Sequence, residues 1–112
     1  MALAAAGLLG TSALAATVGV PGNQTRGKTL FLRGGIFCGS CHALKAAKSV
    51  GRDGSDLDKD RLAYAAIVDA ITNGRQATKR WPAGMPKYGG AQGFLTKRAI
   101  QDIAAYVYNS TH

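Results

Sequence analysis

The sequence feature that most constrains this chain is the run Cys38-Gly39-Ser40-Cys41-His42. Two thiols separated by two residues and followed at once by a histidine form the attachment signature of a c-type haem. Each thiol adds across one haem vinyl group to give a thioether, and the histidine lies beneath the iron as its proximal ligand. A single helical turn presents both sulfurs to the porphyrin edge and brings the next side chain under the metal. The run therefore predicts one covalently bound haem c, attached at Cys38 and Cys41 and ligated by His42.

Three other interpretations of this run are open at the level of the sequence. A thioredoxin-like dithiol requires a nearby βαβ pattern, and none is visible. A closed zinc site needs four protein ligands. Cys38, Cys41, His42 and the terminal His112 are the only cysteines and histidines available in the chain, so zinc is a poor candidate. A disulfide across so short a loop would constrain little of the unfolded chain. We favour haem attachment because it explains the whole run.

Length and composition favour one small helical domain that a cofactor completes. The chain has 112 residues, with 15 glycines, 7% aromatic residues and no glutamate. This composition fits short helices joined by glycine-rich loops better than a bundle of long helices. A chain of this size forms only a marginal core by itself, and a covalent haem would supply a large apolar body for packing. A monomer is the default expectation.

The first twenty residues, 1–20, are rich in alanine, leucine and glycine and carry no charged side chain. Residues 13–15, Ala-Leu-Ala, have the small-x-small pattern of a signal-peptidase site, although no lysine or arginine precedes the apolar run. As a helix, about nineteen residues would rise ~28 Å, close to the ~30 Å hydrocarbon core of a membrane. We interpret 1–22 as a signal peptide or an N-terminal membrane anchor and 23–112 as the folded domain. Both interpretations predict export, to the periplasm or another extracytoplasmic compartment.

Apolar residues at helical spacing predict three short helices within the domain. The first covers 25–33 and is capped by Thr25. Glycine inside a helix costs ~1 kcal/mol relative to alanine, so Gly27 implies the close approach of another helix. A second apolar stripe lies within 61–73 and is best explained by core packing. The third and clearest helix covers 96–109 and is the natural partner for the first.

The loop 75–93 contains the second candidate ligand. Apart from Met1, Met85 is the only methionine, and it lies in a Gly-Met-Pro tripeptide away from any apolar periodic segment. A lone methionine ordinarily fills a core, but a rigid Pro/Gly loop would help to hold a weak thioether ligand on iron. We therefore predict Met85 as the distal iron ligand. Trp81 and Tyr88 in the same loop are candidates for lining the haem crevice, with ordinary packing as the alternative.

The chain is strongly basic, with 14 lysines and arginines, six acidic residues and a formal net charge of +8. A basic surface steers association with acidic partners or anionic membranes. The basic residues are scattered and form no nucleic-acid motif, so we expect no specific nucleic-acid binding. A plain soluble surface is the alternative to a docking role. The residues expected to flank the haem edge and to dock an acidic redox partner are Lys45, Lys48, Lys79, Arg80 and Lys87.

Taken together, these residues resemble a class I c-type cytochrome, a small mono-haem electron carrier that is soluble or tethered to a membrane. The resemblance runs from about Gly27 to Tyr108. The attachment motif alone is specific for haem c, whereas the ordered set of positions is specific for this fold. That set comprises Gly27 and Phe31, the attachment motif, Leu57, Asn73-Gly74-Arg75, Met85-Pro86, and Ile103 with Tyr106-Val107.

The resemblance implies an all-α fold, with three to five short helices around one covalently bound haem and the first and last helices crossing at Gly27. It also implies ligation of the iron by His42 and Met85. The family usually has Gly-Pro before the Leu57 position, and the proline carbonyl orients the haem-ligating histidine. Ser55 stands at that place here. We expect the Ser55 carbonyl to accept the hydrogen bond from His42, in a less rigid loop.

The predicted function is that of a single-electron carrier between membrane or exported oxidoreductases. We expect no enzyme activity, because the sequence shows no convincing nucleophile or general base. One alternative is a membrane-tethered cytochrome c subunit of a larger oxidase or dehydrogenase. Another is a haem enzyme or gas sensor with an open distal site, which requires Met85 to be absent from the iron or readily displaced.

Overall fold

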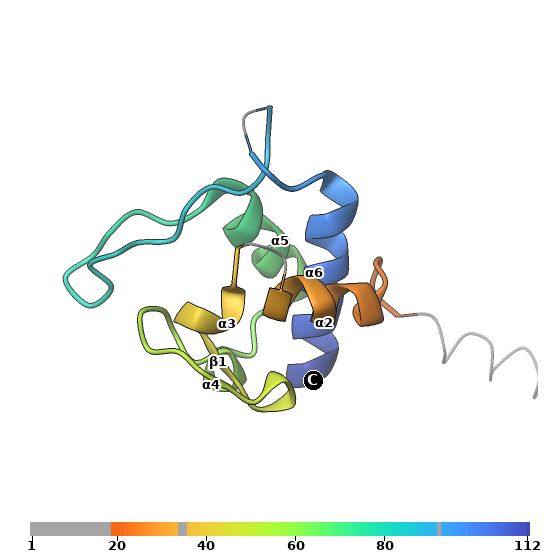
Figure 1. The fold of residues 1–112 in the computed structure, drawn as a ribbon, viewed down its shortest axis with the longest axis horizontal. Helices are drawn as coiled ribbons and strands as arrows, with labels where there is room; N and C mark the ends of the chain where they lie inside the picture. Colours follow the sequence, from red (N-terminus) through yellow and green to blue (C-terminus); the bar gives the residue numbers. More distant parts are fainter. Residues whose placement is uncertain (1–18, 34–35, 92) are drawn as a thin grey trace, which may run out of the picture.

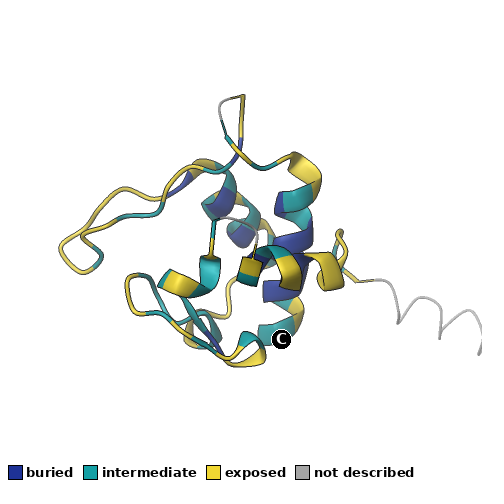
Figure 2. Ribbon diagram, viewed as in Figure 1, coloured by how far each residue is buried: buried dark blue, intermediate teal, exposed yellow. Residues whose placement is uncertain are grey.

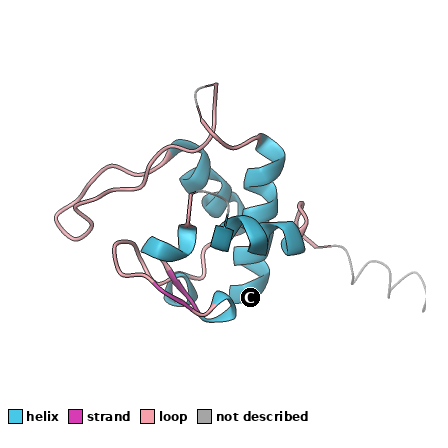
Figure 3. Cartoon of the chain, in the orientation of Figure 1, coloured by secondary structure: helices cyan, strands magenta, loops and turns pink. Residues whose placement is uncertain are grey.

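The computed structural model describes residues 19–33, 36–91 and 93–112 (Figure 1). This part of the chain is mostly helical with one short two-stranded sheet, which confirms the predicted fold class (Figure 3). Its α-helices are α2 (Gln24–Arg33), α3 (Cys38–Cys41), α4 (Leu57–Asp60), α5 (Tyr64–Asn73) and α6 (Lys97–Thr111). Among the described segments, no helix is both long enough and apolar enough to cross a membrane. The signal peptide or anchor predicted for 1–22 lies almost wholly outside the described residues.

The core forms where α2 crosses α6 (Figure 1). Gly27 is buried at this crossing, and a side-chain carbon added to it would overlap the backbone carbonyl of Asp102. This is the close helix approach that the glycine predicts. Phe31 of α2 packs edge-on against Tyr106 of α6, with the ring centres 5.8 Å apart. The buried apolar face of α6 consists of Ile100, Ile103, Ala104, Ala105, Tyr106 and Val107 (Figure 2).

The first turn of α2 is tied to α6 by the acidic residue Asp102, whose side chain is only 4% exposed. Its carboxylate accepts the backbone N–H of Asn23 at 2.7 Å and the Nε–H of Arg26 at 3.0 Å. Asn23 is also the N-cap of the helix, because its side chain accepts the backbone N–H of Arg26 at 2.9 Å. The N-cap predicted at Thr25 is therefore wrong, and Thr25 lies inside α2.

The helix α5 supplies the other wall of the core. It begins at Tyr64, later than the apolar stripe predicted from position 61. Arg61 instead adopts a left-handed backbone conformation, with φ of 44°, and ends α4. Ile67 and Ile71 of α5 are buried and belong to the same apolar cluster as Phe31.

The segment after the attachment motif forms a small hairpin. Strand β1 (Ala43–Leu44) pairs antiparallel with β2 (Ser49–Val50) across the 3-10 turn Lys45–Ala47 (Figure 3). Leu44 is fully buried, which anchors the hairpin to the core. Asp58 of α4 accepts the backbone N–H of Lys45 at 2.8 Å. The chain is therefore held in place directly after His42.

Candidate functional site

The helix α3 consists of the four residues from Cys38 to Cys41, so both thiols lie on one helical turn. Phe37, just before it, has a left-handed backbone with φ of 46°. Its carbonyl accepts the backbone N–H of Ser40 at 2.9 Å and the Ser40 hydroxyl at 2.7 Å. Both cysteines are half-buried and are free thiols. Residues three apart lie on the same face of a helix, so α3 presents the two sulfurs together.

The chemistry of the thiols separates the competing interpretations. Burial raises the pKa of the Cys38 thiol to about 11; a backbone hydrogen bond opposes the shift and the neighbouring Cys41 adds to it. A redox dithiol needs the opposite, a nucleophilic cysteine with a lowered pKa. Zinc is also disfavoured, because no three cysteine, histidine or aspartate side chains gather as a metal site within the described residues.

His42 is held by contacts to its ring and to its backbone. Its Nδ1 lies 2.8 Å from the carbonyl oxygen of Ser55. Since a carbonyl only accepts, Nδ1 carries the proton and Nε2 of the neutral ring carries the lone pair. Gly54 lies against the ring, where an added carbon would come 2.6 Å from Cε1. The backbone N–H donates to the Cys38 carbonyl at 3.0 Å, and the Ser49 hydroxyl donates to the His42 carbonyl at 2.9 Å.

The residues that hold the imidazole are themselves fixed. The N–H of Gly54 donates to the Cys41 carbonyl at 2.8 Å. The Ser55 hydroxyl donates to the carboxylate of Asp60, the last residue of α4. The role of the Ser55 carbonyl was predicted from the sequence, whereas the roles of Asp60 and of Gly54 were not. The signal for Gly54 was its place beside Ser55, whereas Asp60 gave none because α4 itself was not predicted.

Met85 lies at the base of a hairpin formed by residues 75–85, which reaches away from the helices in Figure 1. Its N–H donates to the Arg75 carbonyl at 2.8 Å, and its carbonyl accepts the Arg75 N–H at 2.9 Å. Gly84 has a left-handed φ of 65°, and a carbon added there would come 2.9 Å from the Arg75 carbonyl. Beyond Met85, the N–H of Tyr88 donates to a carbonyl of α5 at 3.0 Å. The backbone of Met85 is thus fixed on both sides.

The base of this hairpin also carries a surface ion pair. Nη2 of Arg75 lies 2.9 Å from the Asp69 carboxylate, and both side chains are about half exposed, at 52% and 56%. The side-chain amide of Asn73 donates to the same carboxylate at 2.7 Å. The hydrogen bonds from Asn73 and Arg75 hold the pKa of Asp69 below its ordinary value. Exposed pairs contribute little to stability, so the backbone pairing is the main support of the hairpin.

Tyr88 and Trp81, the two predicted crevice residues, lie in different places. Burial raises the pKa of the Tyr88 phenol, and negative charge at nearby Cys38 and Cys41 raises it further. Trp81 lies at the turn of the hairpin, where the guanidinium carbon of Arg80 is 5.2 Å from the centre of its ring. Tyr88 and Cys38 thus pack against the same apolar core, whereas Trp81 lies at the hairpin turn.

The two halves of the site border one apolar core. Cys38, Met85 and Tyr88 are all partly buried and pack against the cluster that contains Phe31 and Leu44. The described residues therefore offer two free thiols and an imidazole with its lone pair on Nε2, and the thioether of Met85 borders the same apolar core as Cys38. This donor set fits a haem c, which needs two sulfurs for its vinyl groups and a nitrogen and a sulfur for its iron.

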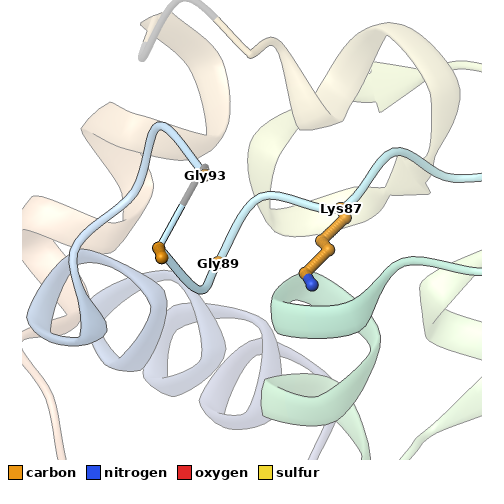
Figure 4. A pocket seen from close by; sticks show the side chains of 4 residues that line it. Lys87, Gly89 and Gly93 are labelled. Carbon is orange, nitrogen blue, oxygen red and sulfur yellow. The ribbon is translucent and has the colours of Figure 1, made fainter.

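Two surface depressions lie elsewhere. Figure 4 shows the first, on the segment after Met85, where it is lined by Lys87, Gly89, Ala91 and Gly93. The second lies between α5 and α6, with Val68, Thr72 and Ile100 among its lining residues. Neither is lined by a cysteine or by His42, so neither is the attachment site.

Comparisons with known proteins found a matching family model and a similar solved structure. A family model described as cytochrome c oxidase, cbb3-type, subunit III matches residues 22–107. Among solved structures, the c-type cytochrome SorU from Sinorhizobium meliloti is similar, with a TM-score of 0.63 and 27% sequence identity. That similarity covers 79% of this chain and 90% of the SorU chain. No curated protein sequence matches this one.

Proposed function

Because the chain belongs to the family described as cytochrome c oxidase, cbb3-type, subunit III, and is a class I c-type cytochrome, we propose that it carries single electrons on one covalent haem c. When bound, the haem supplies an iron that accepts and returns one electron, alternating between Fe(III) and Fe(II). In this proposal Cys38 and Cys41 hold the group through thioethers, and His42 and Met85 are the axial ligands of the iron.

One contact carries the proposal: the hydrogen bond from His42 Nδ1 to the Ser55 carbonyl, at 2.8 Å. It selects the tautomer with the lone pair on Nε2, orients the ring and raises its basicity as a ligand. Gly54 restricts rotation of the same ring. A histidine prepared in this way, directly after two free thiols on one helical turn, is suited to bind a haem iron attached at those thiols.

The remaining residues suit electron transfer better than bond chemistry. His42 is held through both ring and backbone, and Met85 through its backbone, so the proposed ligands need to move little when the charge changes. A thioether ligand from Met85 raises the reduction potential relative to a second histidine. The apolar surroundings of Cys38 and Tyr88 disfavour extra positive charge and act in the same direction. We therefore propose a carrier and not an enzyme.

The decisive experiment is an optical and mass measurement of the mature protein from an exporting host. We expect a mass that includes one haem and the absorption of haem c, with the weak methionine–iron charge-transfer band in the oxidised protein. The band should disappear in Met85→Ala, while the covalent haem stays. A colourless protein without a tetrapyrrole adduct would overturn the proposal. An unchanged band in the variant would remove only the ligand role of Met85 and would favour an open or differently ligated distal site.

We propose that the partner is an acidic redox protein that docks on exposed basic residues. The residues are Lys45 in the 3-10 turn, Lys48 directly after it, Lys79 and Arg80 at the hairpin turn, and Lys87. Opposite charges steer encounter strongly at low salt. Reversing Lys79 and Arg80 to glutamate should slow electron transfer at low ionic strength. The matched control reverses Lys28 and Lys97, which are exposed on α2 and α6; equal rates in the two double variants would overturn the role.

A second candidate is a tethered subunit of a larger oxidase, which the description of the matching family favours. In that case residues 1–20 anchor the domain on the extracytoplasmic side of a membrane. In the first candidate they are a signal peptide, and the protein is free after cleavage. Membrane fractionation distinguishes the two, since the tethered form sediments with membranes and its mass includes the N-terminal residues.

A further inference from the structure

Ser55, which replaces the proline usual in the family, is bonded through its side chain as well as through its carbonyl. The carbonyl accepts the Nδ1–H of His42 at 2.8 Å. The hydroxyl donates to the carboxylate of Asp60. Both groups belong to one short residue, so the bond to Asp60 restrains the backbone that carries the carbonyl which orients the imidazole.

The helix that carries Asp60 is a fixed support. Asp56 caps α4 by accepting two backbone N–H groups of its first turn, at 3.0 and 3.3 Å. Asp58 ties it to the turn after His42, through the N–H of Lys45 at 2.8 Å. Arg61 ties it to α6, because its Nε donates to a backbone carbonyl there at 2.9 Å. A four-residue helix has no stability of its own, so these bonds are what hold Asp60 in place.

We propose that Asp60 is a positioning residue for His42 and that it acts through Ser55. A proline at this place fixes its own backbone through its ring, whereas a serine needs an external restraint. The bond from Ser55 to Asp60 supplies that restraint. The inference rests on the proposed ligation of haem iron by His42, and it adds the residue that sets the strength of the Nδ1 hydrogen bond.

The expected consequence has a definite sign. A stronger hydrogen bond at Nδ1 makes the imidazole a stronger donor, which stabilises Fe(III) more than Fe(II). Loss of the restraint on Ser55 lengthens this hydrogen bond and makes the imidazole a weaker electron-donating ligand. The reduction potential should therefore rise, and the orientation of the ring should change.

The test uses the holoprotein and two measurements, the reduction potential and the hyperfine-shifted proton NMR spectrum of the ferric form. Asp60→Ala and Ser55→Ala each remove the bond, and both should raise the potential and shift the haem-methyl resonances. Asp60→Asn removes the charge but keeps an acceptor oxygen, so it should remain closer to wild type. The charge control is Asp53→Asn, which neutralises an exposed carboxylate two residues before Ser55 and should leave the resonances in place.

A Ser55→Pro background gives the sharpest comparison, because the ring makes the bond to Asp60 unnecessary. Adding Asp60→Ala to Ser55→Pro should produce no further shift. The proposal is wrong if that addition shifts the potential as far as it does in wild type, or if Asp60→Asn shifts it as far as Asp60→Ala. A wild-type protein without haem contradicts the proposed function itself. A haem-bearing wild type with unshifted Asp60→Ala and Ser55→Ala variants contradicts only the role of Asp60.

Discussion

The His42 and Met85 sides of the site are held in different ways. On the His42 side, contacts act on the ring itself: a carbonyl accepts from Nδ1 and Gly54 packs against Cε1. On the Met85 side, the described hydrogen bonds act on the backbone, through pairing with Arg75 at the base of an exposed hairpin. One side chain is oriented directly, and the other is placed only by the chain that carries it. Changes on the two sides should therefore differ in size and in what they alter.

We expect the largest effect from Gly54→Val on the His42 side. The new Cβ would lie 2.6 Å from Cε1 of a ring that its own hydrogen bond holds in place. Overpacking of this kind costs about 3 kcal/mol in the free energy of unfolding. Urea unfolding and the fraction of purified protein that carries haem measure the effect. In the control Ala77→Val, which adds carbon at an exposed position of the folded domain, both should match wild type. A stable, fully loaded Gly54→Val would show that the ring has room to turn.

The next largest effect is expected from Asp102→Asn. Asp102 lies on neither side of the site, so this substitution should lower the free energy of unfolding of the whole domain and affect the His42 and Met85 sides alike. Burial would raise the pKa of the Asp102 carboxyl, but hydrogen bonds from Asn23 and Arg26 and the charges of Arg26 and Arg98 hold it below its usual value. The substitution should cost about 2 kcal/mol at neutral pH, because two charge-assisted hydrogen bonds are weakened.

The pH dependence of this effect follows from the lowered pKa. The carboxylate contributes its full stability above the unfolded-state pKa of about 4 and loses it as the pH falls through the lower folded-state pKa. The difference between wild type and Asp102→Asn should therefore shrink below about pH 4 in unfolding experiments. A difference that is constant down to pH 2 would contradict the lowered pKa.

A smaller effect, confined to the Met85 side, is expected from Gly84→Ala. The left-handed φ of 65° costs a residue other than glycine about 1 kcal/mol. The added carbon would also crowd the Arg75 carbonyl that accepts from Met85. The methionine–iron absorption should weaken while the His42 resonances stay in place. Movement of both sets of signals together would mean that the two sides are not independent.

The smallest effect is expected from Asp69→Asn, which breaks the ion pair with Arg75 at the surface. Both side chains are about half exposed, and pairs of this kind are screened by water and salt. We expect neither the unfolding midpoint nor the methionine–iron band to change measurably at 0.15 M salt. A clear loss of the band would show that the ion pair, and not the backbone pairing, holds the Met85 hairpin.

The sequence predicted the parts of this fold that repeat along a helix or form a compact motif. The apolar face of the last helix and the close approach at Gly27 follow from spacing and residue size, and both are present. The run from Cys38 to His42 is local, so its helical turn was also predictable. The roles of His42 and Met85 on iron stay predictions that the proposed experiments address.

Features that depend on distant residues could not be predicted in this way. Asn23 and Thr25 are both good capping residues, and the choice of Asn23 depends on Asp102, which is 79 residues away in sequence. The bond from Ser55 to Asp60 depends on α4, whose four residues are too few for a periodic pattern. The hairpin that carries Met85 rests on backbone pairing, for which side-chain patterns give little signal.

The crossing of α2 and α6 also bears on when the domain can close during synthesis. These helices pack on each other although the whole length of the domain separates them in sequence. A newly made chain lacks its main core until residues 97–111 have emerged from the ribosome. Cys38 and Cys41 emerge much earlier and are therefore exposed to solvent until the core forms. Order of emergence alone thus gives both thiols an interval of full accessibility before Cys38 packs against the core that contains Leu44 and Phe31.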